Sequence, residues 1–155
     1  MQTKALKIIH QVIAPRDCGK ELVHLFGVSL ALDEELLSQV KQAAAEAGGS
    51  VRVTNDVNEG FVDAEVVYAK SWGSKRFYGS PEEELAARSP YRKDWIVDEE
   101  KMARTKQGIF MHCLPVRRNV IVTDAVIDSP ASVVIDEAEN RLHVQKAILK
   151  ELMSR

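Results

Sequence analysis

The sequence predicts a three-layer α/β sandwich, in which helices cover both faces of a parallel sheet. Short apolar runs rich in β-branched residues alternate along the chain with segments of helical periodicity. Such alternation is typical of parallel strands joined by helical crossovers. The length of 155 residues fits one domain, which can bury a core without disulfides or metal.

The first half of the chain is predicted to contain one strong helix and two strands. The helix begins at Asp33, which can accept hydrogen bonds from the first turn, and ends at Ala47 before two glycines. Strands are predicted at 51–54 and 64–69, and the second is apolar along nearly its whole length, as expected for a strand buried on both faces. The polar segment between them, 56–63, is predicted as a loop with a helical turn.

The second half alternates between short elements and loops. Prolines and charges predict a long loop over 75–95 with one helical turn at 82–87. The remaining predicted elements are, in chain order, a helix at 98–105, a strand at 108–112 that breaks at Cys113-Leu114-Pro115, a helix at 123–127, a strand at 132–135 and a final helix at 136–153. The first 28 residues fit this pattern less well. We interpret 7–13 as a strand and 17–26 as a helix.

Composition and charge exclude several classes of function. The net charge is −2 and the pI about 6.1, so no nucleic-acid surface or basic membrane patch is predicted. No apolar stretch approaches the roughly 18 residues of a membrane span, and the N-terminus is not interpreted as a signal peptide. Cys18 and Cys113 lack disulfide or metal spacing, which favours reduced thiols in a cytoplasmic protein.

Ligands of parallel α/β sheets bind beyond the carboxyl ends of the strands. One predicted strand ends at Lys70 and Trp72, the next at His112 and Cys113, and the third shortly before Arg141. We therefore expect these side chains along one edge of the sheet.

The residues at this edge favour an anionic ligand with a partner that loses a proton. Arg117 and Arg141 can each present a planar fork to a carboxylate or phosphate. Backbone carbonyls freed where the strand breaks at Pro115 can accept hydrogen bonds from an amine or amide. Cys113 beside His112 can act as a nucleophile, or its thiolate beside a cation can hold a substrate amine without covalent chemistry.

Each of these residues also has a structural interpretation. On an apolar strand, residues such as His112 and Cys113 are in general about twice as often core residues as catalytic ones. Arg141 fits a surface arginine, Glu139 fits a partner of the helix dipole, and Trp72 fits packing. The sequence contains no nucleotide-binding glycine loop, nucleophile elbow or metal-spaced cluster. The residues alone thus predict an α/β domain with an anion site.

Three segments, in order, resemble the aspartate/ornithine carbamoyltransferase family. They are Phe110–Asn119, which contains His-Cys-Leu-Pro, then Thr123–Pro130 and Asp136–Ala147. The resemblance covers 29–155 and implies the Rossmann-like second domain of that family, which binds the amino acid. Segment 1–28 matches poorly.

The family transfers a carbamoyl group from carbamoyl phosphate to an amine and releases phosphate. The resemblance implies that His112, Cys113 and Leu114 are catalytic, and that Cys113, Leu114 and Arg141 bind carbamoyl phosphate. The backbone oxygen of Leu114 would hold the carbamoyl amide. No metal or other cofactor is implied, and neither nucleic acid nor membrane is an expected partner.

Arg117-Arg118-Asn119 after the motif, together with Tyr68 to Trp72, is similar to the N-acetylornithine and N-succinylornithine carbamoyltransferases of arginine biosynthesis. In these enzymes the Lys70 and Arg117 positions bind the acylated ornithine. Acylation removes the charge of the α-amine and leaves groups that suit cationic donors. Acetyl-type relatives tend to have lysine at the Ile121 position, so this residue slightly favours succinylornithine.

The family's carbamoyl-phosphate-binding domain, with its Ser-x-Arg-Thr loop and His-Pro-x-Gln motif, is absent from these 155 residues. Family enzymes are trimers with active sites between subunits. The resemblance therefore implies a chain that is inactive alone and needs a homotrimer or a partner chain carrying the missing domain. Three hypotheses follow: a carbamoyltransferase domain, an acylornithine-binding or regulatory module that partners another chain, and a truncated remnant without function.

Overall fold

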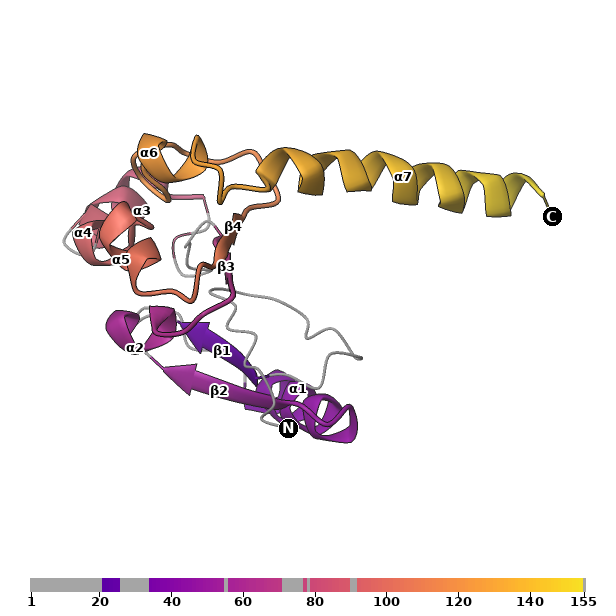
Figure 1. Ribbon diagram of the computed structural model, residues 1–155, viewed down its shortest axis with the longest axis horizontal. Coiled ribbons are helices and arrows are strands. Elements are labelled where there is room, and N and C mark those ends of the chain that lie inside the picture. The colour runs from indigo at the N-terminus through magenta and orange to yellow at the C-terminus, as the bar shows by residue number, and fades with distance from the viewer. Residues whose placement is uncertain are drawn as a thin grey trace.

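The computed structural model describes residues 21–25, 34–54, 56–70, 77, 79–89 and 92–154. Figure 1 shows one group of elements around β1 and β2, a second around β3 and β4, and a long helix, α7, that projects from the second group. Helices alternate with parallel strands, which confirms the predicted α/β class. The described strands form two pairs, β1 with β2 and β3 with β4.

The first group is a β-α-β unit. Strand β1 (Glu21–Leu25) leads to α1 (Glu34–Glu46) and then to β2 (Ser50–Thr54), which pairs parallel with β1 in register from Glu21–Ser50 to Leu25–Thr54. Helix α1 and strand β2 confirm the predictions at 33–47 and 51–54. The predicted cap Asp33 and the predicted strand at 7–13 lie outside the described residues.

The helix predicted at 17–26 is wrong over its described part, because residues 21–25 form β1. The sequence Glu-Leu-Val-His-Leu is short, and its apolar side chains fit a strand as well as a helical turn. Pairing with β2, which is distant in sequence, decides between the two, since strand formation depends on cross-strand partners more than on local preference.

The second group is centred on β3 (Val66–Tyr68) and β4 (Ile109–Met111). These strands are shorter than the predicted 64–69 and 108–112, and they pair parallel with Val67 opposite Phe110. Helix α2 (Val57–Phe61) lies against β1 and β2 and also contacts α5 (Figure 1). The other helices, which belong to this group, are α3 (Pro81–Arg88), α4 (Arg92–Trp95), α5 (Glu99–Ala103), α6 (Asp124–Ile127) and α7 (Val134–Met153).

Local capping explains why several of the short helices were predictable. Asp56 accepts hydrogen bonds from the first turn of α2, Asp98 caps α5 and Thr123 caps α6. The helices predicted at 98–105 and 123–127 are thus confirmed, as is the helical turn at 56–63. The turn predicted at 82–87 is the longer helix α3, and α4 lies where the sequence predicted loop.

The strand predicted at 132–135 is wrong. Ser132 forms a single parallel bridge with Phe110, and the chain enters α7 at Val134, two residues before the predicted start of that helix. The β-branched run is not buried on both faces, because Val134 is buried while the side chain of Ile135 is 72% exposed. The bridge to β4 uses the backbone at 132, and the apolar run then contributes one core residue from a helix.

The core of the second group lies between β3, β4 and the short helices. Its largest fully buried apolar side chains are Phe110, Ile121, Val67 and Val122. His112 is the one buried polar or charged residue among those the structure describes, at 2% exposure. None of the described helices is both long and apolar enough to span a membrane.

Adjacent residues of β4 offer a test of this core. Phe110 is fully buried, whereas Ile109, on the other face, is 37% exposed. We expect Phe110→Ala to lower the free energy of unfolding by about 3–5 kcal/mol, because it leaves a cavity in a close-packed core. Ile109→Ala is the matched control and should cost less than about 1 kcal/mol. Urea unfolding followed by circular dichroism measures both, and similar losses would contradict the described register.

Candidate functional site

The parallel pairing of β3 and β4 brings two predicted site residues into contact. Tyr68 pairs with Met111 at the last register position, and the Ala69 amide donates to the Met111 carbonyl at 3.0 Å. One residue further on, Lys70 Nζ donates a hydrogen bond to Cys113 Sγ at 2.8 Å. Lys70, predicted to bind the acylornithine, and the thiol of Cys113, predicted to line the carbamoyl site, are thus neighbours at the carboxyl edge of this strand pair.

A tight turn follows Cys113. Leu114 has φ of 47°, in the left-handed region that a branched side chain seldom occupies. The Leu114 amide donates to His112 Nδ1 at 2.9 Å, and the Leu114–Pro115 peptide bond is cis. The imidazole therefore holds the turn in a conformation that is unfavourable for leucine.

His112 serves this turn in its neutral form. Burial, with the nearby charge of Lys70, lowers the pKa of His112. Since Nδ1 accepts the Leu114 amide, the ring proton of neutral His112 is on Nε2, a buried atom without a hydrogen-bond partner in the described part of the chain. These surroundings match the core interpretation of His112, and its catalytic role stays a prediction.

The two consecutive arginines differ in their surroundings. Arg118 forms a fork with Asp128, at 2.7 Å for each of two hydrogen bonds, and also donates to Asp124 at 2.9 Å. Hydrogen bonds to these carboxylates raise the pKa of Arg118, and its guanidinium lowers the pKa of Asp124 and of Asp128. Asn119 adds a bond to Asp124 at 2.7 Å. This network ties the loop after the turn to α6.

Arg117 has no part in that network among the contacts of the described residues. Its side chain is exposed and does not line the pocket described below. The structure therefore brings Lys70, Cys113 and Leu114 together without bringing Arg117 to them, and the predicted role of Arg117 in binding acylornithine stays a prediction.

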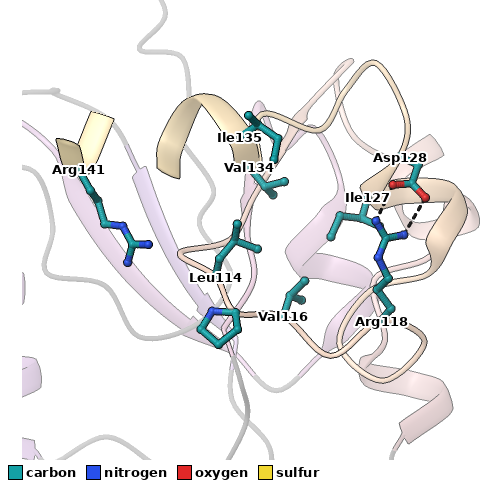
Figure 2. A pocket seen from close by; sticks show the side chains of 9 residues that line it. Leu114, Val116, Arg118, Ile127, Asp128, Val134, Ile135 and Arg141 are labelled. Carbon is teal, nitrogen blue, oxygen red and sulfur yellow. Dashed lines mark hydrogen bonds and ion pairs between the residues drawn. The ribbon is translucent and has the colours of Figure 1, made fainter. Parts of the chain in front are cut away.

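A pocket of about 530 Å³ lies between the turn, α6 and the start of α7. Figure 2 shows Arg141 on one side and the Arg118–Asp128 pair on the other, with Leu114 and Val134 between them. Arg141 makes no hydrogen bond or ion pair with the other described residues, so its fork is available to an anion. The full lining is Leu114, Pro115, Val116, Arg118, Ile127, Asp128, Val134, Ile135 and Arg141.

Two residues without a role predicted from the sequence, Tyr68 and Glu137, also lie at this edge. Tyr68 donates its hydroxyl hydrogen to Glu137 Oε1 at 2.9 Å, which connects β3 to the first turn of α7. Burial, the hydrogen bond to Glu137 and the nearby Cys113 raise the pKa of Tyr68 well above its usual range. A signal for Tyr68 is present in the sequence, because residues two apart in a strand share a face and Tyr68 precedes Lys70 by two.

The remaining candidates are Trp72 and Glu139. Trp72 lies outside the described residues. Glu139 contacts His143 at 3.3 Å on the surface of α7. Among the described residues, no group of three or more His, Cys, Asp or Glu side chains could hold a metal ion.

Residues 7–152 match the family described as aspartate/ornithine carbamoyltransferase, Asp/Orn binding domain. The fold and this match define a domain of the carbamoyltransferase class, and the chain belongs to the aspartate/ornithine carbamoyltransferase family. Within that family it is similar to the N-acetylornithine carbamoyltransferase of Xanthomonas campestris pv. campestris, with 54% identity over 122 residues. The alignment covers 79% of this chain and 36% of that relative.

The ornithine carbamoyltransferase of Pyrococcus abyssi is 39% identical over 143 residues, which are 92% of this chain and 44% of that relative. Among solved structures, acetylornithine transcarbamylase complexed with acetylcitrulline superposes with a TM-score of 0.76 at 42% identity, covering 94% of this chain and 48% of that one. A mutant N-acetyl-L-ornithine transcarbamylase complexed with carbamyl phosphate and N-succinyl-L-norvaline gives 0.75 at 43% identity, covering 95% and 48%. The chain thus spans less than half the length of these relatives.

The neutral imidazole of His112 predicts a loss of stability in mild acid. Its folded pKa is lowered, whereas in the unfolded chain it titrates near 6.5, so only the unfolded state gains this proton just below about pH 6.5. The free energy of unfolding should be independent of this group above about pH 6.5 and should fall as the pH decreases below that value.

His112→Asn tests this assignment, because the asparagine oxygen can replace Nδ1 as acceptor for the Leu114 amide and does not titrate. Urea midpoints measured between pH 7.5 and 5 should decline less steeply for this variant than for the unmodified chain. His143→Asn, which removes an exposed imidazole on α7, is the control. Parallel curves for His112→Asn and the unmodified chain would contradict the assignment.

Proposed function

We propose that this chain is the amino-acid-binding part of an enzyme that transfers a carbamoyl group from carbamoyl phosphate to an N-acylated ornithine. The observation that carries the proposal is the Lys70–Cys113 contact at the strand edge, beside a pocket lined by Leu114 and Arg141. In a member of this family, these are the positions at which the two substrates meet. Solved relatives complexed with acetylcitrulline, or with carbamyl phosphate and N-succinyl-L-norvaline, support the same pair of ligand classes.

Lys70 is suited to the carboxylate of an acylated amino acid. Its ammonium has three N–H donors, and the hydrogen bond to Cys113 uses one of them. Two donors remain for an incoming carboxylate, so Lys70 can bind ligand without leaving the thiol. The acylated α-nitrogen carries no charge that would repel the ammonium, whereas free ornithine brings a second cation to this edge. Lys70 therefore favours N-acylated ornithine.

In the proposed reaction, the side-chain amine of the acylornithine attacks the carbonyl carbon of carbamoyl phosphate. The bond from that carbon to the phosphate oxygen breaks, phosphate leaves, and the amine loses a proton. Arg141 holds the phosphate by charge, and the Leu114 carbonyl accepts a hydrogen bond from the carbamoyl amide. Such residues act by placing the two reactants and by stabilising the charge of the tetrahedral intermediate.

The choice of acyl group is left to experiment. Ile121, the position that slightly favoured succinylornithine, is 1% exposed in the core and does not line the described pocket. Its side chain therefore gives no direct contact by which to choose an acyl group. Other parts of the proposal are that the enzyme is cytoplasmic, acts in arginine biosynthesis, and works as a trimer or with a partner chain.

The donors left on Lys70 beside Cys113 also suit a second candidate, in which the chain binds acylornithine without transferring the carbamoyl group. Carbamoyl-transfer assays should be run with the purified chain alone and in mixtures with the products of neighbouring reading frames. Citrulline-type product formed only in a mixture would establish a divided enzyme. Ligand binding without product in any mixture would favour the binding module.

Ligand titration should detect the acylornithine site directly. We expect N-acetylornithine or N-succinylornithine to raise the melting temperature in a saturable way, because a ligand that binds the native state stabilises it by mass action. Free ornithine should have less effect. Lys70→Ala should abolish the shift, whereas Lys146→Ala, an exposed lysine on α7, should retain it. No shift at millimolar acylornithine would exclude both candidates that retain a site.

The role of Arg141 is tested in any mixture that forms product. Arg141→Ala should lower activity roughly 10- to 100-fold, because a charged hydrogen bond to the phosphate is lost. Lys146→Ala should leave activity unchanged and controls for the loss of one positive charge from α7. Equal activity of Arg141→Ala and the unmodified mixture would show that Arg141 does not bind carbamoyl phosphate.

A further inference from the structure

Helix α7 leaves the domain with few anchors. Val134 is its one buried residue among those described, and the Val133 amide just before it donates to the Phe110 carbonyl at 3.0 Å. Every residue from 139 to 154 is exposed, and Figure 1 shows the helix projecting from the rest of the chain. The direction of α7 is therefore set at its first turn.

One side-chain hydrogen bond joins the first two turns of α7 to the rest of the described chain. It runs from the Tyr68 hydroxyl to Glu137 Oε1, across 69 residues of sequence. The other carboxylate oxygen, Oε2, is buried and has no partner among the described residues. Tyr68 thus supplies the hydrogen bond that offsets the burial of this carboxylate.

Glu137 is also connected to both proposed substrate positions. Tyr68 lies beside Cys113, which accepts the hydrogen bond from Lys70. On the helix side, Arg141 follows Glu137 by four residues and so lies on the same face of α7, one turn further on. Neighbouring side chains therefore lead from Lys70, which is proposed to bind acylornithine, to the helix that carries Arg141, which is proposed to bind phosphate.

We propose that Glu137 is a positioning residue, whose hydrogen bond to Tyr68 fixes the direction of α7 and thereby holds Arg141 at the pocket. The proposal rests on the proposed function for what Arg141 binds, and on the structure alone for how α7 is held. A contact that merely added stability would change the free energy of unfolding and leave the helix direction as it is.

The two partners differ in what their removal leaves behind. Tyr68→Phe leaves both oxygens of a buried carboxylate without a described partner, so the Glu137 side chain should turn toward water and release the first turn. Glu137→Ala breaks the same bond without leaving a buried charge. Glu137→Gln keeps an oxygen acceptor for Tyr68 and is the conservative variant. Glu139→Gln, exposed on the same turn, is the matched control.

Residual dipolar couplings of the full ¹⁵N-labelled chain measure the helix direction. In the unmodified chain, the amide couplings of α7 should fit the same alignment as those of α5 and α6. In Tyr68→Phe and in Glu137→Ala, the couplings from 142 to 153 should fall roughly twofold as the helix samples several directions, while helical carbon shifts persist. Glu137→Gln and Glu139→Gln should match the unmodified chain. Unreduced couplings in Tyr68→Phe or Glu137→Ala, with the core still folded, would overturn the proposal.

A titration with inorganic phosphate then tests the consequence at the pocket. The affinity for phosphate is measured from the shift of the Arg141 Nε–H resonance. If about half of the molecules hold α7 in the binding direction, phosphate should bind about twofold more weakly to Tyr68→Phe. Equal affinity despite reduced couplings would overturn the link between Glu137 and Arg141. If phosphate does not shift this resonance in the unmodified chain, the phosphate role of Arg141 fails, and the couplings alone decide whether Glu137 directs the helix.

Discussion

The pairing of β3 with β4 is the constraint on which the site depends. Val67 opposite Phe110, both fully buried, fixes the register by side-chain packing. A shift by one residue would exchange the buried and exposed faces of a strand, so the core strongly disfavours it. With this register, Lys70 and Cys113 leave their strands at the same edge and come within hydrogen-bonding distance. A contact between two predicted site residues is thus a consequence of how the core packs.

Consecutive residues of the segment after β4 have different structural and proposed functional roles. His112 faces the core and fixes the turn, Cys113 contacts Lys70, and Leu114 lines the pocket. Arg118 is engaged by Asp124 and Asp128, so it holds the loop against α6. Reactive and charged residues of the motif, which look equally suited to a site in the sequence, therefore have different roles in the structure. Structural residues of the motif keep the others in place.

Local signals account for what could be predicted from the sequence. Asp98 and Thr123 cap their helices through hydrogen bonds to nearby backbone groups, which a short window of sequence contains. The convergence of Lys70 and Cys113 followed from a general rule on strand ends. The misplaced elements, β1 and the segment at 132–135, depend on pairing with distant strands. The Tyr68–Glu137 bond was not predictable for a related reason, because it requires α7 to begin at Val134 beside β4, within reach of the Tyr68 side chain.

The exposed apolar side chains of α7 contribute differently to the free energy of folding and to the free energy of association. Leu142, Leu149 and Leu152 are 50%, 58% and 61% exposed, so their apolar surface contributes little to folding of the described domain. The packing of β3 and β4 makes no use of these side chains. Burial of these leucines against another surface would remove their apolar area from water, and the resulting free energy would stabilise that association and not the fold. The outer half of α7 therefore presents apolar side chains whose burial would stabilise an association more than the fold of the described domain.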